Sequence, residues 1–174
     1  NYKENHLKSY AIKSINSNGG VYLVPAFNGL GAPYWDSKAR GIISGLSSSV
    51  GVKEIIRAAV ESSAYQTYDL VRAIEKDGLK TKVVKIDGGM ATNNWFSQFL
   101  SNLLNVKVKR SNLFEATALG AAFMAGLHIG IFKSLNDISK KHKNVKNFSS
   151  KIDNKERQIL INGWLKTLKK TLIR

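Results

Sequence analysis

The sequence predicts an α/β domain in which short strands alternate with helices. Short apolar runs next to glycine or proline are typical of buried strands, and longer segments carry apolar residues every three or four positions, as helices do. The two kinds of segment follow each other more than once, which is the order of an α/β sheet domain. With 174 residues and 43% hydrophobic residues, the chain is large enough for one domain with its own core.

The first fifty residues are expected to contain two short strands. Residues 1–20 are interpreted as a linker or the end of a preceding element, and residues 21–174 as the domain itself. Residues 21–24 read as a buried strand that ends at a proline, and a second strand lies around residues 42–43. The segment between them is rich in glycine and aromatic residues, so we expect an ordered loop there.

A long helix is predicted over residues 53–77. Its expected inward face consists of residues that recur every three or four positions: Ile56, Val60, Ser63, Thr67, Leu70 and Ile74. Gly78 stands where helices commonly end in a left-handed glycine. The acidic residues Asp69 and Glu75 are expected to lie in solvent on this helix.

The second half of the chain repeats the pattern of strand and helix. Residues 82–86 read as a strand and residues 87–89 as a turn. A second helix starts near Thr92 or Asn93, and Asn105 can end it in a left-handed conformation. Its apolar face is expected to hold Trp95, Phe96, Phe99, Leu100, Leu103 and Leu104.

Four further segments complete the chain. A short strand is predicted at residues 106–108, and a third helix, rich in alanine and glycine, over residues 114–128. The polar residues 133–150 are expected to be a connection, and the tail from residue 153 an amphipathic helix. The inward side of that helix is expected to contain Ile159, Leu160, Trp164, Leu165 and Leu168.

The composition limits the classes of function. The net charge is +15, from 27 basic and 12 acidic residues, but the lysines are scattered and no aromatic residues interleave with the densest basic cluster. A nucleic-acid-binding role is therefore the least favoured class. No run of about 18 apolar residues occurs, so we expect no membrane contact. The absence of cysteine excludes thiolate metal sites and fits a cytoplasmic location, and the three histidines lack metal-ligand spacing.

The paired glycines of the turn at residues 87–89 are the clearest candidate for a binding site. A strand–turn–helix junction leaves backbone N–H groups free at a helix N-terminus, where anions and nucleotides bind. Gly88 and Gly89 lack a Cβ, so a bulky group could lie against the backbone. The amide of Asn93 can donate and accept hydrogen bonds, which suits an adenine edge. The local sequence alone also fits a turn that glycine shapes and Asn93 caps, with no ligand.

Four segments, in chain order, carry a resemblance to a known family. VPAFNGLGAPYWDSKARGIISGL, KEIIRAAVESSAYQTYDLV, VKIDGGMATNNWFSQFLSNLLNVKV and EATALGAAFMAGL resemble the C-terminal domain of the FGGY family of carbohydrate kinases. The resemblance extends from about Gly20 to the tail helix. Other sugar kinases of the family usually carry a Gly-Glu-Arg-Thr-Pro-like stretch where this chain has Gly-Leu-Gly-Ala-Pro at residues 29–33. Within the family, glycerol kinases are therefore the best match.

The resemblance implies an RNase H-like domain of the actin-like ATPase type, with a mixed sheet and packed helices. It implies ATP and Mg²⁺ as cofactors, with Gly88 and Gly89 against the nucleotide and Asn93 at the adenine. Gly120 and Ala121 would pack at an interdomain hinge. Four loop residues are expected to hold the glycine-rich loop together: Tyr34, Trp35, Asp36 and Arg40.

The resemblance also indicates what this sequence lacks. In the family, the catalytic base, the phosphate-binding loops and most sugar contacts lie in segments upstream of Asn1. No residue here is therefore assigned to catalysis or metal binding, and glycerol would bind through an N-terminal kinase domain, in cis or in trans. The isolated chain is expected to be inactive. A non-catalytic remnant of a kinase gene, the same domain of another FGGY sugar kinase, and a homo-oligomer remain open.

Overall fold

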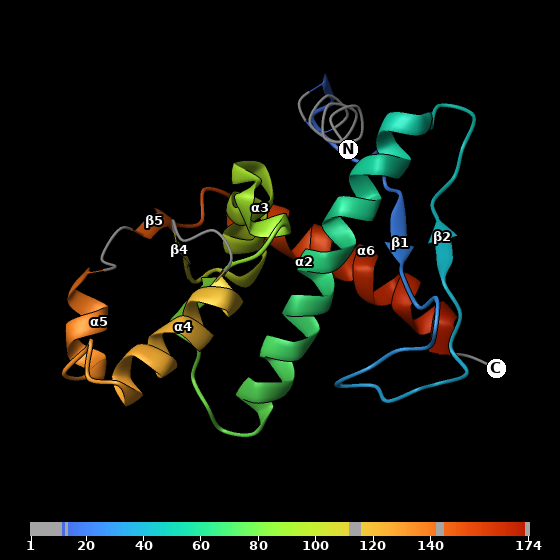
Figure 1. Ribbon diagram of the computed structural model, residues 1–174. Coiled ribbons are helices and arrows are strands. Elements are labelled where there is room, and N and C mark those ends of the chain that lie inside the picture. The colour runs from blue at the N-terminus through green and yellow to red at the C-terminus, as the bar shows by residue number, and fades with distance from the viewer. Residues whose placement is uncertain (1–11, 13, 112–115, 142–144, 173–174) are drawn as a thin grey trace.

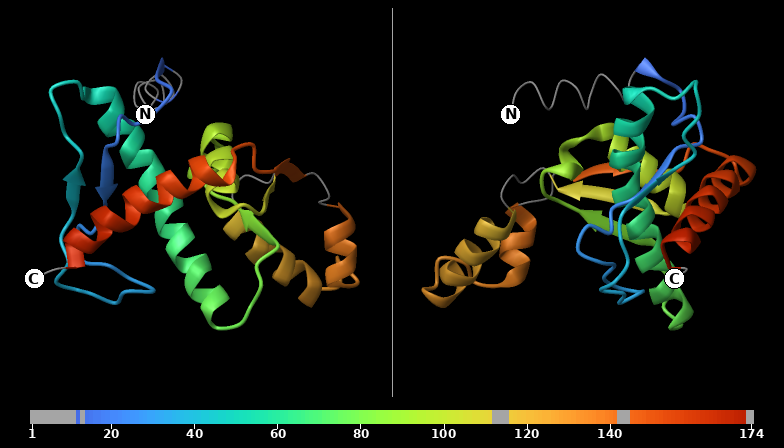
Figure 2. Two further views of the ribbon diagram at one scale, coloured as in Figure 1. Left: turned by 180° about the vertical axis from the view of Figure 1, so that it is seen from behind. Right: turned by 90° about the vertical axis from the view of Figure 1, so that its right-hand side faces the viewer.

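Two helices, α2 (Val52–Lys76) and α6 (Asn154–Leu172), cross at the centre of the computed structural model (Figure 1). The structure describes residues 12, 14–111, 116–141 and 145–172. A two-stranded sheet lies on one side of the crossing and a three-stranded sheet on the other, as the left view of Figure 2 also shows. This mixed α/β architecture is the predicted fold class.

Apart from α5 and β5, the remaining elements follow the predicted order. The antiparallel pair consists of β1 (Tyr22–Val24) and β2 (Ile42–Ser44), and the larger sheet of β3 (Val83–Ile86), β4 (Lys107–Ser111) and β5 (Val145–Phe148). A single 3₁₀ turn, η1 (Met90–Thr92), leads from β3 into α3 (Asn94–Leu104). Two further helices are α4 (Ala116–His128) and α5 (Leu135–Lys141).

The three-stranded sheet is mixed, as predicted. Strand β4 pairs with β3 in parallel and with β5 in antiparallel orientation. Val84, Val108 and Phe148 are register partners and share the face that packs on the core. Lys85 and Lys109 are also partners, one position along, and therefore share the opposite face.

Aromatic side chains fill the core between the two crossing helices. Trp164 of α6 is fully buried and stacks on Tyr65 of α2, with ring centroids 5.1 Å apart. Phe99 of α3 meets Tyr65 edge to face at 5.7 Å, which joins the third helix to the pair. The predicted apolar face of α3 is confirmed, because five of its six residues are buried and Trp95 packs against the same cluster.

The predicted helix ends are confirmed by backbone geometry. Gly78, after α2, has φ +92°, and Asn105, after α3, has φ +54°, so both lie in the left-handed region. Asn93 caps α3. These signals are local, because a cap depends only on its own dihedral angles and on the first or last turn of its helix.

The predicted connection over residues 133–150 is wrong, because it contains α5 and β5. The mostly polar residues of β5 do not predict a strand: only Phe148 is buried, and the other three residues are exposed. The strand forms because β4 offers a free edge. An edge pairing of this kind leaves no period in the sequence.

The inward faces predicted for the two long helices are partly wrong. On α2, Val60 is buried as predicted, but Leu70 and Ile74 are exposed, and the buried positions also include Tyr65 and Glu61, which were not predicted. On α6, Ile159 and Leu165 are exposed, and Trp164 and Leu168 are buried as predicted. Each helix contacts elements on more than one side, so one apolar face does not describe its packing.

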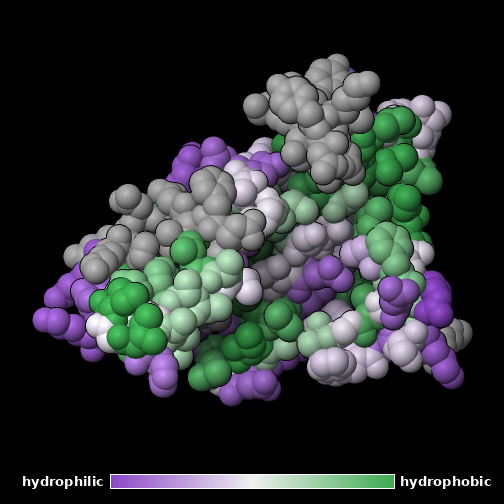
Figure 3. Space-filling view, viewed as in Figure 1, coloured by the Kyte–Doolittle hydropathy of each residue, from purple (hydrophilic) through white to green (hydrophobic). Residues whose placement is uncertain are grey.

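Helix α4 carries apolar side chains that the described residues leave largely exposed. Figure 3 shows hydrophobic surface around α4 and the turn that follows it, and Met124 and Ile129 are more than half exposed. The predicted start of this helix at residues 114–115 lies outside the described residues. Within the described part of the chain, no helix is long and apolar enough to cross a bilayer. The hinge role of Gly120 and Ala121 stays a prediction.

Candidate functional site

The candidate turn lies at the carboxyl end of β3, where the chain passes through η1 into α3. Strand β4 runs parallel to β3, so the carboxyl ends of both strands meet at this edge, which is where ligands bind in open α/β sheets. A hollow of about 310 Å³ adjoins the turn there. Its lining is Lys85, Ile86, Asp87, Lys109, Ser111 and Val145.

The two glycines leave open space beside the backbone. Gly88 has φ +83°, whereas Gly89 is in the right-handed helical region at φ −58° and ψ −43°. A Cβ added to either glycine would meet no atom within 4 Å. Steric packing inside the described protein therefore does not require glycine at 89, and the backbone conformation does so only at 88.

The backbone amides of this turn are available to a ligand. Within the described residues, the N–H groups of Gly88, Gly89 and Met90 have no hydrogen-bond acceptor. Those of Ala91 and Thr92 donate to the carbonyl oxygens of the two glycines. The change from a left-handed Gly88 to a right-handed Gly89 is the kind of alternation found in anion-binding turns. The turn therefore presents donors where a phosphate or a ring nitrogen could accept.

Asn93 is used by the protein itself, but only in part. Its Oδ1 accepts hydrogen bonds from the N–H groups of Trp95, at 2.9 Å, and Phe96, at 3.3 Å. The residue is thus the N-cap of α3, and its acceptor is occupied. Its Nδ2 remains as a donor, so an adenine contact would run from this amide to a ring nitrogen.

Two residues that hold the turn were not predicted from the sequence. Arg110 of β4 donates to the carbonyl oxygens of Ala91 and Thr92, at 2.8 and 3.0 Å. Ser97 of α3 is fully buried and donates to the carbonyl oxygens of Ala91 and Asn93, both at 3.1 Å. The sequence carries no signal for either contact, because Arg110 lies on a mostly polar strand about twenty residues after the glycine pair.

The hollow is basic and has no metal-binding cluster. Lys85 and Lys109 line it from neighbouring strands, so their charges favour an anionic ligand. Among the described residues, no three histidine or carboxylate side chains come together as metal ligands. These residues therefore suit phosphate groups, and they do not fit a dedicated Mg²⁺ site.

The glycine-rich loop before β2 is held by its own polar groups. The Asp36 carboxylate accepts from the N–H groups of Lys38 and Ala39, and Arg40 donates to the carbonyl oxygens of Ser37 and Ala39. The structural role expected for Asp36 and Arg40 is therefore confirmed. The Trp35 side chain is 78% exposed and does not hold the loop, contrary to expectation.

Asp69 is buried in α2, and its predicted solvent exposure is wrong. Trp164 Nε1 donates to Asp69 Oδ2 at 2.9 Å, across 95 positions of sequence. Burial raises the pKa of Asp69 to about 6, against the opposing effect of hydrogen bonds from Trp164 and Tyr34. Tyr34 belongs to the glycine-rich loop, so this carboxyl group joins the loop to α2 and α6.

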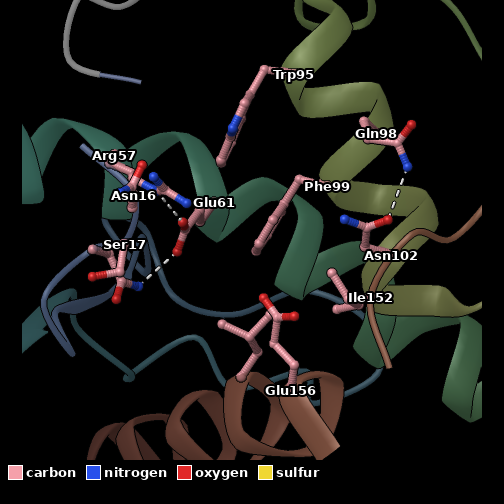
Figure 4. A pocket seen from close by; sticks show the side chains of 12 residues that line it. Asn16, Ser17, Arg57, Glu61, Trp95, Gln98, Phe99, Asn102, Ile152 and Glu156 are labelled. Carbon is pink, nitrogen blue, oxygen red and sulfur yellow. Dashed lines mark hydrogen bonds and ion pairs between the residues drawn. The ribbon is translucent and has the colours of Figure 1, made fainter. Parts of the chain in front are cut away.

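A second hollow, of about 170 Å³, lies between α2, α3 and the start of α6 (Figure 4). Arg57 Nε and Asn18 Nδ2 donate to the buried Glu61 carboxylate at 2.8 and 2.7 Å. The Arg57 guanidinium also lies 4.9 Å from the ring centroid of Trp95, which stacks on Phe99. These polar groups satisfy one another, so we interpret this hollow as a place where the segment around Asn18 packs on the helices and not as a ligand site.

Comparisons with known proteins agree with this geometry. A model of the C-terminal domain of the FGGY family of carbohydrate kinases matches residues 3–129. The chain is 50% identical over 159 residues to a glycerol kinase of Gluconobacter oxydans, which covers 91% of this chain and 31% of the relative. It is 49% identical over 170 residues to a glycerol kinase of Coxiella burnetii, covering 98% of this chain and 34% of the relative.

Solved structures share the fold. A glycerol kinase of Plasmodium falciparum, crystallised with ADP, superimposes with a TM-score of 0.84 at 36% identity, over 98% of this chain and 36% of that protein. A xylulose kinase of Lactobacillus acidophilus superimposes with a TM-score of 0.71 at 22% identity, over 89% of this chain and 31% of that one. This chain therefore spans about a third of the length of its relatives.

The family model covers well over half of the chain, and the match to the Coxiella burnetii relative covers nearly all of this chain. The predicted resemblance and the actin-like ATPase fold are therefore confirmed. The chain belongs to the FGGY family of carbohydrate kinases, to whose C-terminal domain it corresponds.

Proposed function

We propose that this chain, over residues 21–174, is the adenine-nucleotide side of an ATP-dependent glycerol kinase. The reaction would transfer the γ-phosphoryl group of ATP to a hydroxyl of glycerol, giving ADP, glycerol 3-phosphate and a proton. The observation that carries the proposal is the open Gly88–Gly89 turn at the carboxyl ends of two parallel strands. Relatives near 50% identity that are named glycerol kinases support the substrate.

Each residue of the turn has a definite role in this proposal. The nucleotide lies against the backbone of Gly88 and Gly89, where a side chain would stand in its way. Asn93 Nδ2 donates to a ring nitrogen of adenine while its Oδ1 keeps capping α3. Lys85 and Lys109 attract the phosphate groups from the adjoining hollow.

The remaining parts of the reaction are assigned to other segments of the enzyme. Mg²⁺ would neutralise charge on the phosphate oxygens when bound, and no residue of this chain is assigned as its ligand. Glycerol would be held by an N-terminal kinase domain, in cis or in trans. The isolated chain would thus be inactive. The complete enzyme would act in the cytoplasm.

The proposal is tested by ADP titration calorimetry with turn variants of the protein at its native length. Gly89→Ala leaves the backbone unstrained, so it isolates the effect of filling the space, and Gly89→Val fills more of it. Asn93→Ser retains a good N-cap but removes the Nδ2 donor. We expect Asn93→Ser to weaken ADP binding several-fold, as loss of one hydrogen bond does, and Gly89→Val to weaken it more than Gly89→Ala.

The controls use the same substitutions away from the turn. Gly31→Ala adds a Cβ that meets nothing within 4 Å, and Asn154→Ser changes an exposed asparagine at the start of α6. Both should bind ADP as the wild type does. Unchanged ADP affinity in Gly89→Val and Asn93→Ser, with both proteins folded, would remove the turn from the nucleotide site.

A further inference from the structure

We infer that Arg110 is a positioning residue that fixes the turn from Gly88 to Asn93 in its ligand-binding shape. The inference rests on the proposed nucleotide site at this turn. Arg110 is given no contact with the nucleotide; it acts through the backbone of η1. Three observations carry it: the hydrogen bonds of its guanidinium, its register on β4, and the weakness of the turn that it holds.

The guanidinium of Arg110 connects three groups of the turn. Its Nη1 lies 2.8 Å from the carbonyl oxygen of Ala91, 3.0 Å from that of Thr92 and 3.0 Å from Asn94 Oδ1. The first two are consecutive carbonyls at the end of η1. A charged donor makes stronger bonds to such acceptors than a neutral one.

The register of β4 lets Arg110 hold the chain both before and after the two glycines. Arg110 pairs in the ladder with Ile86, two positions before Gly88, through its backbone. Its side chain reaches Ala91 and Thr92, which follow Gly89. One residue therefore fixes where the chain enters the turn and where it leaves.

The turn needs such support because its own hydrogen bonds are few. Element η1 is only three residues long, and a single 3₁₀ turn has poor hydrogen-bond geometry. A glycine pair at its start adds backbone freedom that must be lost on ordering. Ser97 supports the same carbonyl of Ala91 from α3, so the turn is held from both the sheet and the helix.

Arg110 is itself held in place. Its guanidinium carbon lies 5.7 Å from the ring centroid of Phe148, a buried residue of β5. Lys146, on the same face of β5, lies 5.7 Å from that ring and also donates to Asn94 Oδ1, at 3.2 Å. The guanidinium therefore rests on an aromatic surface, and its direction toward the turn is set before any ligand binds.

Three variants separate the geometry of Arg110 from its charge. Arg110→Ala removes both. Arg110→Lys keeps the charge but replaces the planar guanidinium, whose Nη1 makes these contacts, with an ammonium group on a shorter side chain. Lys107→Ala removes one positive charge from an exposed position of the same strand and is the matched control. The proteins are compared at their native length by hydrogen exchange of the segment 88–93 and by ADP titration.

We expect Arg110→Ala to bind ADP about tenfold more weakly, the scale of a lost charged hydrogen bond. Without ligand, it should also exchange the hydrogen-bonded amides of Ala91, Thr92 and Asn93 faster. Arg110→Lys should restore part of both losses, whereas Lys107→Ala should match the wild type. If ADP protects the segment in the wild type and Arg110→Ala binds ADP equally well, the inference is overturned and the nucleotide site stands. If ADP does not protect the segment in the wild type, the proposed site fails and the inference falls with it.

Discussion

Asp69 shows how one side chain can connect distant parts of this chain. Its carboxylate is buried on α2, accepts from Trp164 of α6 and faces Tyr34 of the glycine-rich loop. Its position on a long helix suggested solvent exposure, because acidic residues are mostly exposed. The carboxyl group can nevertheless be buried because Trp164 and Tyr34 donate hydrogen bonds to it. Its raised pKa shows that burial disfavours the charged form.

The raised pKa predicts a pH dependence of stability. Between about pH 4 and pH 6 the folded protein keeps a proton on Asp69 that the unfolded chain has lost, so the free energy of unfolding falls as pH rises through that range. Asp69→Asn should lack this fall. Relative to that variant, the wild type should lose on the order of 1–2 kcal/mol between pH 4 and pH 7, measured by urea denaturation at each pH.

A matched variant controls for the loss of an acidic residue. Asp77→Asn, at the exposed end of the same helix, should leave the pH dependence of the wild type in place. If the wild type and Asp69→Asn show parallel stability between pH 4 and pH 7, Asp69 does not titrate as described.

At the scale of elements, the close approach of α6 to β1 depends on a glycine. Gly163, next to Trp164, packs against the Tyr22 ring, and a Cβ at this position would overlap that ring. Tyr22 also contacts Tyr65, with ring centroids 5.6 Å apart, so it has little room to move. The glycine therefore sets the distance between helix and strand.

This packing predicts an unusual sign for a helix substitution. Glycine to alanine inside a helix normally stabilises by about 1 kcal/mol. Gly163→Ala should instead destabilise by about 1–3 kcal/mol, the range for overpacking a core. Gly120→Ala, in α4 with nothing within 4 Å, should show the normal sign. Chemical denaturation of both variants measures this, and a gain in stability for Gly163→Ala would contradict the close packing.

At the scale of the whole molecule, the described residues form a common core beside the candidate turn, and the chain spans about a third of the length of its relatives. Phosphoryl transfer requires a metal ion, phosphate clamps and an oriented nucleophile held together. The described residues supply an open glycine turn and basic groups, without a cluster of metal ligands. In our proposal these parts bind the nucleotide, and an N-terminal kinase domain positions glycerol.

We therefore predict that the purified 174-residue chain shows no glycerol-dependent ATP turnover. A coupled assay for ADP release, with and without glycerol, measures this. The glycerol kinase of Coxiella burnetii, assayed in parallel, shows that the assay can detect the reaction. Glycerol-dependent turnover by the isolated chain would mean that it holds a complete active site.

The sequence by itself determined the features that depend on neighbouring residues. The order of strands and helices outside residues 133–150, the helix ends at Gly78 and Asn105, and the cap at Asn93 follow from local dihedral preferences and short-range hydrogen bonds. The family resemblance also located Gly88 and Gly89 as the candidate turn. These local signals survive in any fold that contains the segment.

The tertiary structure alone decided the features that depend on residues far apart in the chain. Strand β5 exists because β4 has a free edge, Asp69 is buried because Trp164 reaches it, and Arg110 holds the turn because β4 lies beside β3. Polar residues of this kind carry no apolar period, and their burial is favourable only when a distant partner satisfies them. The sequence contains both partners, but only the fold brings them within hydrogen-bonding distance.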